Sequence, residues 1–180
     1  MHKGTRRLTV IASSPTKGKT PVFGVLERGG EVRAHVIPNR KRHAIETEIK
    51  NHVAAGSALY SDSLASYAFL PPHYRHEVID HAEGYVRGQV HTNGLENFWS
   101  LVKRGLKGTY ISVEPFHLFR YLDEQVYRYN NRATKNNPMN DGDRFLKAMK
   151  TIAGRRITYQ ELTGKGTDSI HHDPAGTRPA

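Results

Sequence analysis

The chain has 180 residues, with 27 Lys and Arg against 17 Asp and Glu, so its formal net charge is +10. It has no cysteine, which excludes disulfide scaffolds, thiol catalysis and cysteine-ligated zinc, and no apolar run approaches the roughly 18 residues of a membrane span. The length allows one domain of ordinary size and a tail, and the charge favours a polyanionic partner, most often a nucleic acid; the alternative is a charge that only keeps the protein soluble.

The first half of the chain alternates strand-like runs with helical ones. Short runs rich in apolar and β-branched residues predict strands at 8–12, 20–26, 31–37, 57–61 and 76–80. The Gly-Gly turn within 27–30 joins the second and third of these into a hairpin. Residues 43–53 predict a helix, because Ile45, Ile49 and Val53 recur at helical spacing, and a short helix is expected at 63–70.

In the second half of the chain, apolar residues recur mainly at helical spacing, which predicts a series of helices. After an irregular stretch at 84–88, helices are expected at about 92–106, 114–131, 142–153 and 158–162. Asp141 is a suitable N-cap for the third of them. Residues 164–180 hold one large apolar residue and are expected to be disordered. The order of elements predicts an α/β fold with a mixed sheet.

The run from His91 to Arg104 carries the most chemical information. As a helix it has an apolar stripe and a separate polar face, on which Glu96 and Lys103 lie about 10 Å apart along the axis. A metal-binding carboxylate and a phosphate-binding cation could use that separation on one DNA strand. The alternatives are structural: Asn93 and Glu96 also form a capping-box pattern, and Lys103 also fits a solvated face. Trp99 is interpreted as a core residue rather than a platform for base stacking.

Asp62 is the second candidate, because it directly follows a predicted buried strand, where α/β sheets often place ligands. The alternative is an N-cap for the segment that begins at Ser63. The eleven histidines show no convincing metal-ligand spacing. Basic residues are concentrated before residue 43 and recur further along; those expected to contact DNA are Arg40, Lys41, Arg42, Lys103, Arg104 and Lys107.

Two stretches resemble a known family. Tyr-Ser-Asp-Ser-Leu-Ala-Ser-Tyr at 60–67 and Gly-Tyr-Val-Arg-Gly-Gln-Val-His-Thr-Asn-Gly-Leu-Glu-Asn-Phe-Trp-Ser-Leu-Val-Lys-Arg-Gly at 84–105 resemble the DDE-type transposases of bacterial insertion sequences, in particular the ISXO2-like group. Later pieces of the chain, at 115–121, 129–132 and 155–162, fit the same group. The similarity covers about residues 19–164.

The resemblance implies a ribonuclease-H-like mixed sheet with flanking helices, and metal-dependent cleavage and transfer of DNA strands. Asp62 would be the second metal-binding group, and Glu96, or Asn93 in its place, the third. Lys103 would match the basic residue that follows it. The implied cofactor is a pair of Mg²⁺ or Mn²⁺ ions, about 4 Å apart. The implied partners are transposon ends, target DNA and further copies of the chain, in the nucleoid of a bacterial cytoplasm.

The departures from the family pattern are as informative as the match. The family carries its first catalytic Asp on the opening strand, in an Asp-Glu-x-x-x-Gly-Gly signature that this chain lacks, and an amino-terminal zinc ribbon that is also missing. We therefore expect residues 1–163 to form a catalytic domain incomplete at its start, with the first strand missing and catalysis defective. The alternatives are a non-catalytic DNA-binding remnant that modulates an intact transposase, and a basic protein whose helices dock on a partner.

Overall fold

The computed structural model describes residues 7–12, 20–62, 73–79, 93–110, 112–135 and 137–164, and for residues 7–12, 62 and 79 it describes the backbone. The expected helix at 63–70, the irregular stretch at 84–88 and the tail after residue 164 lie outside the described residues. The chain divides into two units, residues 1–140 and 141–180.

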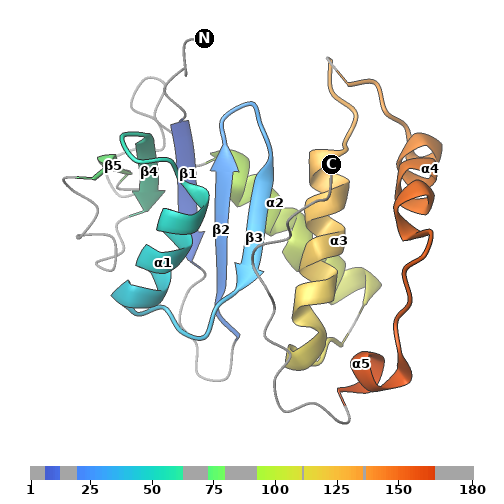
Figure 1. The fold of residues 1–180 in the computed structure, drawn as a ribbon. Helices are drawn as coiled ribbons and strands as arrows, with labels where there is room; N and C mark the ends of the chain where they lie inside the picture. Colours follow the sequence, from blue (N-terminus) through green and yellow to red (C-terminus); the bar gives the residue numbers. More distant parts are fainter. Residues whose placement is uncertain are drawn as a thin grey trace. The chain divides into compact units, whose positions relative to one another are not determined.

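A five-stranded mixed sheet forms the centre of the first unit (Figure 1). Its strands are β1 (Arg7–Ala12), β2 (Val22–Glu27), β3 (Val32–Val36), β4 (Ala58–Asp62) and β5 (Arg75–Ile79). They lie in the order β3-β2-β1-β4-β5. β1 pairs antiparallel with β2 and parallel with β4, and β4 pairs parallel with β5. The mixed α/β sheet is confirmed.

The expectation of a missing first strand is wrong. Residues 7–12 occupy the centre of the sheet, where Leu8 pairs with Glu27 on one side and with Leu59 on the other. Pairing uses backbone groups alone, so an apolar β-branched run can take this place without the acid that the family signature would supply. β1 reads Arg-Leu-Thr-Val-Ile-Ala and holds no Asp or Glu, so the acid is absent although the strand is present.

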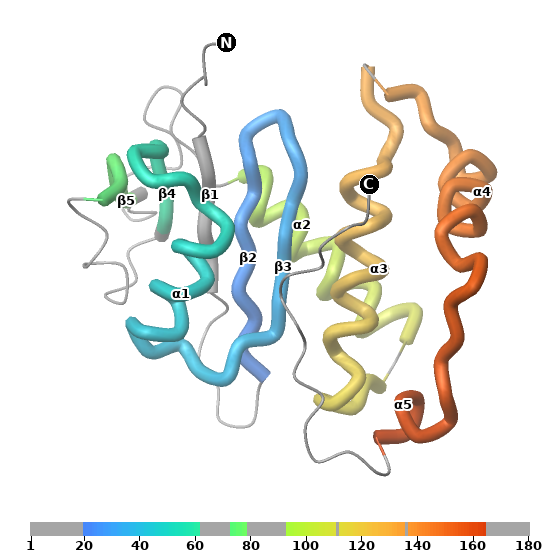
Figure 2. The backbone as a smooth tube through the Cα atoms, viewed as in Figure 1, coloured from blue at the N-terminus to red at the C-terminus, as the bar shows by residue number. Residues whose placement is uncertain are grey.

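Helices cover both faces of the sheet. Helix α1 (Arg42–His52) buries Ile45 and Ile49 against Phe23 and Leu59. Helices α2 (Asn93–Arg104) and α3 (Leu118–Asn130) pack their apolar stripes against the opposite face. The two faces follow from alternation along β2, since consecutive strand residues point to opposite sides. Figure 2 shows the same arrangement as a tube, with α1 and α2 on different sides of the strands.

The edge strand β3 is covered by a side chain of α3. The Asn130 side-chain oxygen accepts a hydrogen bond from the Val32 backbone N–H (2.8 Å), and its amide nitrogen donates to the Val32 carbonyl (2.9 Å). The amide group thus satisfies both backbone groups of one residue, as a neighbouring strand would. An edge protected in this way is less available for pairing with another chain.

The predicted helix at 92–106 ends as a regular α-helix at Arg104. A π-helical turn, η2 (Gly105–Thr109), continues it and closes with the Tyr110 N–H bonded to the Gly105 carbonyl. Glycine is a weak helix former, and two of the five residues of this turn are glycine. The predicted helix at 114–131 appears as a short 3₁₀ turn, η3 (Pro115–His117), followed directly by α3.

The second unit is described from residue 141 to residue 164 and contains two helices. Helix α4 (Asp141–Ile152) begins at Asp141 itself, whose carboxylate pairs with Arg144. Helix α5 (Tyr159–Thr163) has a complete capping box, in which Thr158 and Glu161 exchange hydrogen bonds. The predicted turn at 158–162 is therefore present as a short helix.

Candidate functional site

Helix α2 holds the residues that the sequence singles out, and its position depends on two glycines. A Cβ atom at Gly24 of β2 would lie 2.4 Å from Cζ2 of Trp99, and one at Gly94 would lie 2.6 Å from Cδ2 of Leu26. Both distances are shorter than real carbon contacts allow, so glycine permits α2 to approach β2 closely. Trp99 packs against Phe98 and the apolar cluster of this face, which confirms its interpretation as a core residue.

Asn93 and Glu96 lie in the first turn of α2. Asn93 is exposed and Glu96 is half-buried. The helix begins at Asn93 itself, whereas the capping-box alternative needs Asn93 just before the helix. A carboxylate in a first helical turn is favoured by the helix dipole whether or not it binds a metal. The position of Glu96 therefore suits either a metal ligand or a carboxylate that only stabilises the start of the helix.

Asp62 is the last residue of β4, and its side chain lies outside the described residues. The first turn of α2 lies over β2 near Leu26, which pairs with Thr9 of β1, and Thr9 in turn pairs with Tyr60 of β4. β1 therefore runs between the strand beneath Gly94 and the strand that ends in Asp62. Convergence of Asp62 with Asn93 and Glu96 stays a prediction.

The residue before Asp62 is polar and buried. The Ser61 hydroxyl lies 2.7 Å from Nε2 of His76 on β5. Burial lowers the pKa of His76 below its ordinary value of 6.5, so the neutral ring is favoured. A neutral ring has one acceptor and one donor nitrogen, and either can serve the hydroxyl. The pair holds β5 to β4 at the end of the sheet where Asp62 lies.

The predicted DNA-contacting residues fall into two groups on elements that cover opposite faces of the sheet. Lys103, Arg104 and Lys107 are exposed at the end of α2 and in η2. Arg40, Lys41 and Arg42 lie at the start of α1, where Arg42 is 3.9 Å from Glu46.

The turn that carries Lys107 is fixed against α3. The Tyr110 hydroxyl donates a hydrogen bond to Glu124 and its ring packs edge-on against Tyr121, with 4.6 Å between the ring centroids. That hydrogen bond, together with burial, raises the pKa of Tyr110 above its ordinary value. Arg128 is 2.9 Å from the other oxygen of Glu124. These contacts thus fix the turn that carries Lys107, directly after Lys103 and Arg104 at the end of α2.

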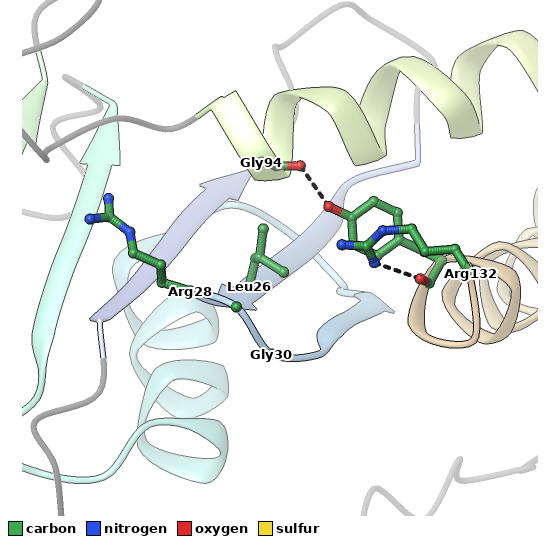
Figure 3. Close-up of a pocket in the computed structure, with 7 residues that line it drawn as sticks. Leu26, Arg28, Gly30, Gly94 and Arg132 are labelled. Atoms are coloured by element: carbon green, nitrogen blue, oxygen red, sulfur yellow. Dashed lines mark hydrogen bonds between the residues drawn. The ribbon is translucent and has the colours of Figure 1, made fainter. Parts of the chain in front are cut away.

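A pocket of about 170 Å³ lies beside the first turn of α2, and the sequence did not point to it (Figure 3). The β2–β3 hairpin, Gly94 and the end of α3 form it, and its lining residues are Leu26, Arg28, Gly29, Gly30, Gly94, Tyr129 and Arg132. The Tyr129 hydroxyl donates to the Gly94 carbonyl (3.3 Å), which ties the end of α3 to the start of α2. The available signal was the Tyr-Asn-Asn-Arg run at 129–132.

Arginine gives this pocket its charge. The Arg132 guanidinium stacks on the Tyr129 ring at 3.9 Å, and its Nη1 donates to the Tyr129 carbonyl at 2.6 Å. The Arg28 guanidinium lies 5.5 Å from the centre of the Tyr60 ring, on the side of the hairpin away from Arg132 (Figure 3). Planar guanidinium groups suit phosphate oxygens, so this corner of the molecule can bind an anionic backbone.

The comparisons with known proteins give one family and one fold. A family model described as the ISXO2-like transposase domain matches residues 2–130. The catalytic core domain of BIV integrase is a similar solved structure, with a TM-score of 0.53 and 15% sequence identity, over 83% of this chain and 99% of the integrase chain. No curated protein matches the sequence. None of the described helices is both long and apolar enough to cross a membrane.

Proposed function

Because this chain belongs to the ISXO2-like transposase domain family and has an integrase-like, ribonuclease-H-like fold, we propose that it is the catalytic domain of a DDE-type transposase whose strand cleavage is defective. Membership of the family implies DNA transposition, DNA binding and a general dependence on divalent metal ions. The observation that carries the defect is β1: it takes the central place in the sheet and holds no carboxylate.

The proposed metal-binding residues are Asp62 and Glu96, with Asn93 as the alternative to Glu96. Carboxylate oxygens are the ligands that Mg²⁺ and Mn²⁺ prefer. The donor set does not fit a pair of ions, because the strand between β2 and β4 supplies no third acid. Asp62 and Glu96 together would hold no more than one ion, and that ion with modest affinity. Lys103 lies on the same face of α2 as Glu96, about 10 Å further along the helix axis, and would contact the DNA backbone there.

A purified chain tests the defect directly. With Mg²⁺ or Mn²⁺ it should nick a supercoiled plasmid no faster than a protein-free control, because loss of one carboxylate in such a cluster costs orders of magnitude in rate. Nicking that Asp62→Ala abolishes would contradict the proposal, and Glu27 and Glu31 would then be the acids to replace next.

A gain-of-function variant sharpens the test. Continuing the β1–β4 register by one residue puts Ile11 beside Asp62, so Ile11→Asp should restore metal-dependent nicking that Asp62→Ala removes again. Val10→Asp is the matched control, because successive strand residues face opposite sides of a sheet. Circular dichroism on both variants separates a failure to fold from a failure to cleave. Equal activity in the two variants would contradict the proposed place of the missing acid.

DNA binding is proposed to rest on Lys103, Arg104 and Lys107. In a titration across salt concentrations, Lys103→Ala should reduce the slope of log K against log salt by about 1, as expected for one lost phosphate contact. Lys50→Ala is the matched control, since Lys50 is already paired with Glu46 at 2.8 Å. An affinity that barely changes with salt would exclude phosphate contacts as its source.

The acid-free β1 also favours a second function, that of a DNA-binding remnant that modulates an intact transposase. Such a chain would form mixed oligomers on transposon ends in the nucleoid of a bacterial cytoplasm. Adding it to an intact transposase of the same family should lower strand transfer in proportion to its share of the protein. No change at a tenfold excess would exclude this role.

A further inference from the structure

Three potential metal ligands meet on the face of the sheet that α1 covers. His35 comes from the edge strand β3, and Glu48 and His52 come from α1. One ligand atom from each residue lies within 4.8 Å of the other two. This group is separate from α2, which packs against the opposite face, so its chemistry is independent of the proposed transposase site.

The fold brings these residues together through two periodicities. Val32 and Ala34 are buried beneath α2 and α3, so alternation along β3 turns His35 to the other face, toward α1. Glu48 and His52 are four residues apart and therefore neighbours on one side of the helix. Ile45 and Ile49 anchor α1 to the sheet and fix which side of the helix faces β3.

The two helical ligands already have a spacing suited to zinc. Nε2 of His52 lies 3.4 Å from Oε2 of Glu48. Two ligands bound at about 2.0–2.1 Å in a tetrahedron are separated by about 3.3–3.4 Å. The His52 side chain is 10% exposed, and its buried Nε2 has no hydrogen-bond partner within the described part of the chain. In a neutral His52 ring, a lone pair on Nε2 is available to a cation that the neighbouring Glu48 carboxylate also binds.

The third ligand requires one side-chain rotation. The His35 and His52 rings are stacked, with 4.7 Å between centroids and 15° between planes. An imidazole binds a metal through a lone pair in its own plane, so two parallel rings cannot both point at one ion. A turn of one ring about its Cβ–Cγ bond breaks the stack and lets both bind. Metal binding therefore exchanges a ring contact for a coordinate bond.

We infer that His35, Glu48 and His52 form a zinc site that links α1 to the edge strand β3. Two imidazoles and one carboxylate are a donor set that suits Zn²⁺ and not Mg²⁺, which prefers oxygen ligands. Water completes the tetrahedron. The ion fastens the helix to the sheet, and binding to the folded chain alone raises its stability.

The experiment uses the full chain, stripped with a chelator and titrated with Co²⁺ and Zn²⁺. The chain and its His43→Ala control, an exposed histidine of the same helix, should bind one ion per chain, with the visible absorption of tetrahedral Co²⁺. Zn²⁺ should displace the Co²⁺, excess Mg²⁺ should not, and Zn²⁺ should raise the unfolding temperature of both proteins.

Three substitutions decide the outcome: His35→Ala, His52→Ala and Glu48→Gln. Each should weaken Zn²⁺ binding by at least tenfold, since loss of even an outer-shell partner costs about 10–100-fold, and each should remove the thermal shift. Glu48→Gln keeps the size of the side chain, so it remains informative if a histidine variant fails to fold. Zn²⁺ binding that Glu48→Gln leaves unchanged, or the absence of binding by the unaltered chain, would overturn the inference.

Discussion

On the face of the sheet covered by α2 and α3, the candidate residues Asn93, Glu96 and Lys103 all come from one contiguous helix, α2. On the face covered by α1, His35, Glu48 and His52 come from two separate elements and meet only in the fold. The first arrangement can be found by a motif and the second cannot. The difference teaches that a family resemblance directs attention to one face of a molecule, whereas spatial clusters on the other face need the structure.

The largest expected effect tests whether the two faces unfold as one unit. Phe98→Ala should lower the free energy of unfolding by about 3–5 kcal/mol, because the ring is 1% exposed and lies 5.4 Å from the Tyr129 ring. Urea unfolding measures the loss. Native-state hydrogen exchange then shows whether the amides of α1 lose protection equally; retained protection of α1 would mean that the faces are energetically separate.

A smaller loss is expected from added bulk beneath α2. Gly24→Ala should cost about 1–3 kcal/mol, because its Cβ would lie 2.4 Å from Cζ2 of Trp99 and α2 would have to move. Gly108→Ala is the control, since a Cβ there meets nothing within 4 Å. If both substitutions have the same effect in thermal unfolding, close approach of α2 to β2 does not limit stability.

Loss of the Asn130 clamp, the pair of hydrogen bonds between the Asn130 side chain and the Val32 backbone, should lower the free energy of unfolding by a comparable or slightly smaller amount. Asn130→Ala removes both partners of the Val32 backbone groups and should cost about 1–3 kcal/mol, with more aggregation at high concentration. Asn97→Ala, at an exposed position of α2, should stay within about 0.5 kcal/mol. Urea unfolding and light scattering measure the two consequences. Equal behaviour of the two variants would contradict the role of the clamp.

The smallest effect is a dependence on pH. Because burial lowers the pKa of His76, the unfolded chain binds this proton more readily than the folded chain. The contribution of His76 to stability is therefore complete above about pH 6.5 and is lost as the pH falls through the folded-state pKa. The free energy of unfolding of the unaltered chain, minus that of His76→Gln, should decrease from pH 8 to pH 5. A difference that is constant with pH would contradict the shift.

Local features of the sequence predicted where most helices and strands lie along the chain, but not which strands pair with each other. The spacing of Ile45 and Ile49 located α1, and the β-branched run at 8–12 located β1. The central place of β1 was missed because pairing between distant strands depends on backbone groups, which leave no residue signature. The acid expected on the opening strand concerns catalysis, and its absence says nothing about whether that strand pairs.

The candidate sites divide in the same way. Asp62 is the last residue of its strand, one position earlier in the element than the pattern predicted, and Glu96 lies in the first turn of its helix as predicted, because both positions depend on local sequence. The zinc ligands were missed, since the spacing of Glu48 and His52 fits any charged helix and acquires meaning only when β3 brings His35 beside them. The pocket that Arg28 and Arg132 line could not be predicted either, because it exists only where the end of α3 meets the β2–β3 hairpin.

The absent side chain of Gly24 has a practical consequence. Trp99, the only tryptophan of the chain, rests on that glycine, and its indole nitrogen is buried without a hydrogen-bond partner among the described residues. Its fluorescence therefore reports on the packing of α2 against β2. Emission at short wavelength corresponds to a seated helix, and a red shift would signal its release into water. The fold thus contains its own optical probe for any event that moves the middle of α2 away from β2.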